Sequence, residues 1–113
     1  MPVRVTGTAL YFAKINPLPG SRLIVSVVDA GRADASAVML ARKSYAIKAI
    51  PARFALNVSS KALRVGGAGV SLRAEIHGPG GQLMWVSDTH IPVVVRPGSK
   101  TVNVGEIVLT GVK

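Results

Sequence analysis

The sequence predicts an all-β protein, an antiparallel β-sandwich of about seven or eight strands. Short runs rich in Val, Ile and Leu alternate with clusters of Gly, Pro, Asn and Asp, and this spacing is typical of sandwiches and barrels. Two runs alternate between apolar and polar residues, as strands with one buried and one solvated face do. The chain has 113 residues, which is enough for one hydrophobic core, so residues 1–113 are expected to form a single domain.

Three strands are expected before residue 48. One face of the first run carries Val3, Val5, Gly7, Ala9 and Tyr11. One face of the second carries Leu23, Val25 and Val27, with Ser26 opposite. The segment Ala33–Lys43 allows two interpretations, a short helix capped by Asp34 or a strand over Val38–Ile47. We favour a short turn followed by the strand.

The two central strands alternate most clearly. The residues expected to be buried are Ile50, Phe54, Leu56, Leu72, Ala74 and Ile76. Those expected to be exposed are Arg53, Arg73 and Glu75. The Gly-Gly-Ala-Gly segment at residues 66–69 is interpreted as a flexible turn that leads into the second of these strands.

The last third of the chain predicts a hairpin and two further strands. The Gly-Pro-Gly-Gly turn at residues 78–81 is expected to join the preceding strand to Gln82–Ser87. A run at Ile91–Val95 follows, and Pro92 marks it as an edge or a strand start. The final strand spans about Thr101 to Leu109.

A β-bulge is predicted in this final strand near Gly105-Glu106. Val102 and Val104 share one parity, whereas Ile107 and Leu109 share the other. Because side chains alternate between faces, a regular strand would direct one of these pairs into solvent. One extra residue at Gly105 would let all four point inward.

The chain is strongly basic, with 14 Lys and Arg against five acids and a formal net charge of +9. Such a surface attracts nucleic acid, anionic membranes or acidic protein segments. The basic residues are scattered singly, apart from Arg42-Lys43, whereas nucleic-acid binders more often cluster them. We therefore interpret most of them as a solvated basic surface.

Cysteine is absent, which excludes disulfides and thiolate metal sites. No apolar run approaches the roughly 20 residues that span a bilayer, and no signal peptide is apparent. The expectation is either a cytosolic protein or the mature region of an exported one.

No constellation of catalytic or metal-binding residues is found. Glu75 and His77 lie two residues apart on one predicted strand, but a metal site needs three or more ligands. The segment Ser87-Asp88-Thr89-His90 contains the residue types of a serine triad. The residues of a functional triad converge in space rather than following one another in sequence, and this sequence contains no nucleophile elbow. Asp88 is expected to bond turn amides instead. We therefore expect no enzyme activity, no cofactor and no metal, with His77 and His90 dispensable.

The aromatic residues favour packing over nucleic-acid binding. Trp85 is the single tryptophan and is expected to belong to the core. The remaining aromatics are few and dispersed, whereas nucleic-acid modules on β scaffolds use several for base stacking. No nucleic-acid partner is therefore predicted.

Several short motifs occur in a recognisable order. Val5-Thr6-Gly7 and Tyr11 open the chain, Leu18-Pro19 precedes Leu23-x-Val25-x-Val27-x-Asp29, and Ala33-Asp34 follows. Pro51-x-x-Phe54-x-Leu56 comes next, and Trp85-Val86-Ser87-Asp88-Thr89 with Pro92-Val93 closes the series. Over about Val3 to Leu109, this order resembles the YscW/YbaY family of small bacterial outer-membrane lipoproteins.

The resemblance implies a β-sandwich, a location at the periplasmic face of the outer membrane, and a partner. Family members with a known role are pilotins of type III secretion, lipid-anchored chaperones that bind the C-terminal segment of secretin subunits. The family's lipidated cysteine has no counterpart here, so the chain is expected to be the mature region without signal peptide and anchor. Two alternatives stay open: an envelope lipoprotein domain with another partner, and a basic nucleic-acid-binding β-barrel.

The candidate partner-binding residues are Met84 and Val86. They lie on the strand face opposite Trp85, where an apolar surface ringed by basic residues would hold a secretin segment. The alternative is that the sandwich buries both faces of this strand, which would make Met84 an ordinary core residue.

Overall fold

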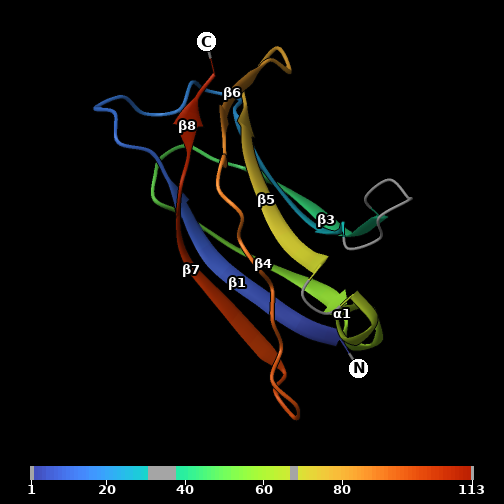
Figure 1. Cartoon of the computed structure of the whole chain (residues 1–113). Helices are drawn as coiled ribbons and strands as arrows, with labels where there is room; N and C mark the ends of the chain where they lie inside the picture. The colour runs from blue at the N-terminus through green and yellow to red at the C-terminus, as the bar shows by residue number, and fades with distance from the viewer. Residues whose placement is uncertain (1, 31–37, 67–68, 113) are drawn as a thin grey trace.

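Two β-sheets pack face to face in the computed structural model, which describes residues 2–30, 38–66 and 69–112 (Figure 1). The small sheet has the strand order β4-β1-β7, with β1 at Pro2–Leu10, β4 at Ala52–Ser59 and β7 at Thr101–Val108. The large sheet has the order β3-β2-β5-β6-β8, with β2 at Arg22–Asp29, β3 at Val38–Ala46, β5 at Val70–His77, β6 at Leu83–Val86 and β8 at Thr110–Gly111. These eight strands confirm the predicted sandwich.

One strand pair departs from the predicted antiparallel arrangement. β1 is antiparallel to β4 but parallel to β7, with Arg4 opposite Thr101 and Val5 opposite Val102. The pairs of the large sheet are all antiparallel. The parallel pair arises because the segment between β6 and β7 returns to the end of the sandwich where β1 begins, so both strands start there.

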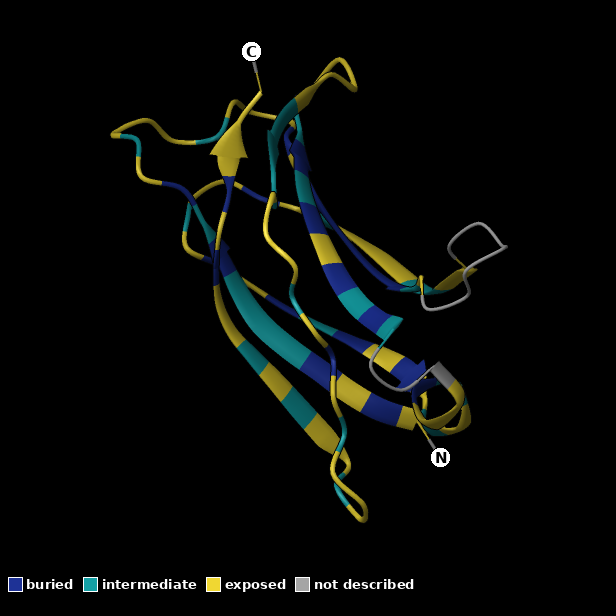
Figure 2. Ribbon diagram, viewed as in Figure 1, coloured by how far each residue is buried: buried dark blue, intermediate teal, exposed yellow. Residues whose placement is uncertain are grey.

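The core lies between the two sheets and is supplied mainly by alternate residues of each strand (Figure 2). Phe54, Leu56, Leu72, Ala74 and Ile76 are buried and Arg53 and Arg73 are exposed, as predicted. Two residues differ from the prediction. Ile50 is half-buried because it precedes β4 in a turn, and Glu75 is half-exposed because it lies against His77.

The remaining strand predictions are confirmed in part. β3 begins at Val38, as the turn-and-strand interpretation requires, while Asp34 lies outside the described residues. Ile91–Val95 does not form the predicted regular strand. Its backbone follows β5 through bonds at Ile91 and Val93, but pairing is reduced to one bridge at Pro92, which has no N–H to extend a ladder.

A short helix, α1 at Ser60–Gly66, was not predicted. It links β4 to β5 across the two sheets, and the Ser59 hydroxyl accepts a hydrogen bond of 3.3 Å from the Ala62 N–H, as N-cap residues do. Of the turn predicted at residues 66–69, residues 67 and 68 lie outside the described part of the chain.

The bulge predicted in the last strand is confirmed. Thr6 lies opposite Asn103 and Thr8 opposite Glu106, so residues 104 and 105 together oppose Gly7. Ile107 and Leu109 are buried, while Val102 and Val104 are half-buried against the core. The bulge therefore lets both parities of β7 face the small sheet's inner side.

Gly105 has φ 77°, a left-handed conformation that side chains rarely adopt, and nothing lies within 4 Å of the position its Cβ would take. We expect Gly105→Ala to lower the free energy of unfolding by about 1 kcal/mol through backbone strain alone. Gly105→Asn is the matched control, because Asn tolerates this conformation better. Urea denaturation of both variants checks this, and equal losses would contradict it.

Tyr45 closes one side of the sandwich, where edge strands β3 and β4 adjoin. Its hydroxyl donates a hydrogen bond to the Ala55 carbonyl and accepts one of 3.0 Å from the Ala55 N–H. These backbone groups point away from β1, so a side chain satisfies them in place of a further strand.

Candidate functional site

The large sheet presents an outer face that no described helix or strand covers. The small sheet packs against its other side, and α1 lies against β4 (Figure 1). Trp85 pairs with the core residue Ile76, whereas Val86 pairs with Glu75, so Val86 lies on the outer face. Met84 has the same parity as Val86, but it is the extra residue where the register of β5 and β6 shifts, since Ile76 pairs with Trp85 and His77 with Leu83. Both candidate residues are half-buried and neither packs against the core.

The same face carries a nearly covered apolar strip on β2. Ile24 and Val28 are each only 9% exposed, yet neither belongs to the central core cluster. Ile24 lies opposite Glu75, which in turn pairs with Val86 on the next strand. An apolar path therefore crosses the outer face from β2 towards β6, interrupted by one carboxylate.

Arginines border this path. Arg42 on β3 and Arg73 on β5 flank Ser26 of β2 on its two sides, and both are exposed. Arg22 begins β2, and its Nε donates a hydrogen bond of 2.7 Å to the Ser44 hydroxyl. We call the set Arg22, Ile24, Val28, Arg42, Arg73, Glu75, His77, Met84 and Val86 the outer face.

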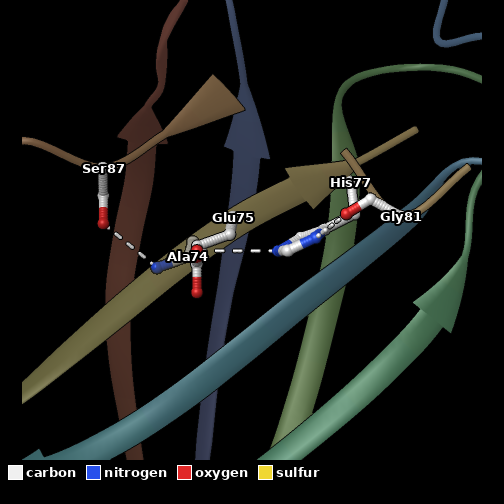
Figure 3. Close-up of polar contacts among 5 residues, drawn as sticks. All are labelled: Ala74, Glu75, His77, Gly81 and Ser87. Carbon is white, nitrogen blue, oxygen red and sulfur yellow. Dashed lines mark hydrogen bonds and ion pairs between the residues drawn. The ribbon is translucent and has the colours of Figure 1, made fainter. Parts of the chain in front are cut away.

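The polar contacts at β5 are structural (Figure 3). His77 Nε2 lies 3.6 Å from the Glu75 carboxylate, and His77 Nδ1 lies 3.1 Å from the Gly81 carbonyl oxygen. The pair thus ties β5 to the turn that follows it. Among the described residues, no group of three His, Cys, Asp or Glu side chains could hold a metal ion.

The residues of the Ser-Asp-Thr-His segment do not converge on one another. The Ser87 hydroxyl accepts a bond of 3.0 Å from the Ala74 N–H, which continues the pairing of β5 beyond β6 (Figure 3). Asp88 accepts a bond of 2.9 Å from the Thr110 hydroxyl of β8, which corrects the expected bond to turn amides. His90 is exposed. This segment fastens the strands of the large sheet together.

Trp85 anchors the loop that follows β1. Its ring stacks on Tyr11 with centroids 3.9 Å apart and planes 4° from parallel, and it is half-buried against the core rather than fully enclosed. Burial raises the pKa of Tyr11, so its hydroxyl stays protonated and donates a 2.7 Å bond to the Ile15 carbonyl. The loop is thereby held in one position although Phe12 and Ile15 project into solvent at 82% and 62% exposure.

A second surface combines basic and apolar side chains. A groove of about 640 Å³ lies over the junction of β1, β4 and β3, and its lining includes Arg4, Lys43 and Arg53. Lys43 Nζ lies 5.2 Å from the centre of the Tyr45 ring. This groove offers positive charge to an acidic segment beside the apolar side chains of Tyr45 and Phe54, which also line it.

The sequence analysis predicted Met84 and Val86 as partner-binding residues and did not single out Ile24 and Val28 on the neighbouring strand β2. The signal was present, because Leu-Ile-Val-Ser-Val-Val at residues 23–28 is apolar at both parities, unlike β4 and β5. A strand that is apolar on both faces predicts burial on both. β2 agrees with this, because Ile24 and Val28 are each only 9% exposed although the other sheet packs against the opposite face.

Comparisons with known proteins identify a family and a similar solved structure. A family model described as "Type III secretion system lipoprotein chaperone (YscW)" matches residues 1–105. A structure of an alternative pilotin from the type II secretion system of Vibrio cholerae matches with a TM-score of 0.82 and 26% identity, over 100% of this chain and 99% of that one.

A 9R-lipoxygenase from Cyanothece shares the fold alone, with a TM-score of 0.51 and 15% identity over 95% of this chain and 16% of that one. A search of curated protein sequences found no match. The family description names a chaperone, and the described residues include no helix long and apolar enough to cross a membrane.

Proposed function

Because the chain belongs to the YscW family of type III secretion system lipoprotein chaperones, we propose that it acts as a pilotin by holding the C-terminal segment of a secretin on its outer face. The likeness to a pilotin over both full chains supports this role. The role requires a surface for capture and no reactive group. The observation that carries the location is the partly exposed Val86 on the outer face, which continues into the apolar but only 9% exposed Ile24 and Val28 of β2.

Apolar contact supplies most of the affinity in this proposal. An isolated secretin tail is disordered and must become ordered as it binds, which costs conformational entropy. Exposed ion pairs contribute only about 0–1 kcal/mol each and cannot offset that cost alone. Met84 suits the task, because an unbranched thioether adapts its shape to different partners.

The arginines of the outer face contribute to partner selection and to the rate of association. Arg22, Arg42 and Arg73 would attract a segment that carries acidic residues and would raise its association rate more than its final affinity. Moderate salt should therefore slow association while leaving a measurable complex, since screening acts mainly on exposed charges.

We expect Met84→Asp and Val86→Asp each to weaken secretin-tail binding about tenfold or more, because each places a charge on the contact surface. The measurement is calorimetric titration at low salt with the C-terminal peptide of a candidate secretin. Val108→Asp is the matched control, since Val108 is an exposed valine, 42% accessible, on β7 of the other sheet. Thermal unfolding followed by circular dichroism should show that all three variants are folded.

Two results would contradict this proposal. If Val108→Asp weakens binding as much as Val86→Asp, the outer face is not the capture site. If no secretin tail binds the unaltered chain at low salt, the chaperone has another partner in the cell envelope. Tails from type III and type II secretins should be compared, because the family model and the structural likeness concern different systems.

A further inference from the structure

One end of the sandwich gathers the start of β1 and the helix α1. Pro2 pairs with Ser59, and α1 begins at the next residue, Ser60 (Figure 1). β7 also starts at this end, because Arg4 lies opposite Thr101 and donates its N–H to the Lys100 carbonyl. Any segment that precedes Pro2 therefore joins the sandwich beside α1. We call this the α1 end.

The α1 end exposes large apolar side chains. Val65 of α1 is 68% exposed, and Met39 and Val38 at the start of β3 are 54% and 45% exposed. Between α1 and β3 lies a shallow groove of about 310 Å³, whose lining is mostly apolar and includes Val38, Leu40, Ala62 and Val65. Met39 pairs with Val28 and so belongs to the outer face, whereas the two solvated valines, Val38 and Val65, line the groove and indicate a contact surface.

Cations surround this apolar surface. Lys61 and Arg64 are exposed on α1, which has no acidic residue in its first turn. Lys61 also lines the groove, together with Asp29, which is itself engaged in an interaction. Arg4 and Lys100 lie at the same end through the register of β1 and β7. Apolar side chains ringed by Lys and Arg suit the interface of an anionic bilayer.

We propose that the α1 end is the membrane-facing surface of the protein. Val65 and Val38 enter the headgroup region, and Lys61 and Arg64 pair with lipid phosphates. This inference rests on membership of a lipoprotein family, whose lipid anchor would join before Pro2, and not on secretin capture. A single acyl chain binds a bilayer only marginally, so a basic and apolar patch beside it supplies the second contact that stable attachment needs.

In this orientation, the outer face and the membrane-facing surface lie on different sides of the molecule. The strands of both sheets then rise away from the membrane, so the outer face with Met84 and Val86 stands at the side of the molecule. The loop carrying Phe12, which follows the other end of β1, points away from the bilayer. Membrane contact and partner capture therefore use different surfaces.

The absence of cysteine permits a direct test with site-specific probes. We would place one environment-sensitive fluorophore on Val65→Cys and, in a separate protein, on Phe12→Cys. Each is mixed at low salt with vesicles of phosphatidylethanolamine and phosphatidylglycerol, or with phosphatidylcholine vesicles. We expect the probe at residue 65 to brighten and shift to the blue with the anionic vesicles only, and the probe at residue 12 to stay unchanged. Brightening at residue 12 alone, or no vesicle binding at all, would overturn the proposal.

A charge-reversal pair tests the same surface without a label. Lys61→Glu with Arg64→Glu should reduce co-sedimentation with the anionic vesicles several-fold, while Lys14→Glu with Lys48→Glu, at the opposite end, should reduce it far less. The reversed pair at the α1 end should still bind the secretin tail in solution as the unaltered chain does. If it loses the peptide but keeps the vesicles, the groove belongs to the partner and the membrane assignment is wrong. Failure of the tail to bind any protein would contradict the proposed function alone.

Discussion

Phe54→Ala should lower the free energy of unfolding by about 3–5 kcal/mol, the usual cost of removing a buried aromatic ring. Phe54 is 4% exposed and lies on β4 directly opposite Gly7 of β1. A domain of this size has a total stability of about 5–15 kcal/mol, so the variant should unfold at a much lower urea concentration.

The ring of Phe54 also explains why residue 7 is glycine. A Cβ at position 7 would lie 2.6 Å from Phe54 Cζ and 2.8 Å from Val104 Cγ2, distances at which neighbouring atoms must move. Gly7→Ala should therefore cost about 1–3 kcal/mol, as overpacking does. The methyl group should be better accepted once the ring is gone, so the double variant should lose less stability than the sum of the two single variants.

Gly111→Ala is the matched control for this cycle. A Cβ at position 111 would meet the Trp85 ring at 3.4 Å, an ordinary contact, and the expected change is within about 0.5 kcal/mol. Equilibrium unfolding in urea measures the stability of the unaltered chain, the two single variants, the double variant and the Gly111→Ala control. Strict additivity of Gly7→Ala and Phe54→Ala would show that the two residues do not compete for space.

The second large effect is expected at Tyr11. Tyr11→Ala removes a side chain that is 3% exposed together with its stack on Trp85, and should cost about 3–5 kcal/mol. Tyr11→Phe keeps the ring and loses only the hydrogen bond to the Ile15 carbonyl, so about 1 kcal/mol is expected.

Trp85 reports on this change directly because it is the only tryptophan of the chain. Its emission should shift to longer wavelength in folded Tyr11→Ala, where the ring becomes more solvated, and should stay unchanged in Tyr11→Phe. Phe12→Ala controls for the loop itself, since its side chain is 82% exposed and should be nearly neutral. An unshifted spectrum in folded Tyr11→Ala would mean that the stack does not shield Trp85.

The predictions from sequence succeeded where local alternation decides the structure. β4 and β5 each have one buried and one solvated face, so their burial could be predicted residue by residue. The bulge was predictable for the same reason, since Val104 and Ile107 have opposite parity yet both pack towards the core. The prediction for Ile50 was wrong because the alternating pattern of β4 was extended to a residue that precedes the start of the strand at Ala52.

Features that depend on distant contacts could not be predicted. Nothing within β7 indicates that its neighbour is β1 or that the pair is parallel. The seven residues of α1 are too few for a helical period to emerge from the sequence. The sequence analysis predicted only Met84 and Val86 on the outer face, because the position of the second sheet decides which side of β2 faces outward.

The place of β1 between β4 and β7 bears on when this protein can acquire its native shape. β1 ends at Leu10, but one of its two neighbours, β7, begins only at Thr101. Until then β1 has an unpaired edge, and the small sheet is left with a two-stranded hairpin-like pair of marginal stability. Pairing of such distant segments is slow, because a long loop must close first. The small sheet can therefore reach its full width only after β7, close to the end of the described chain, has become available.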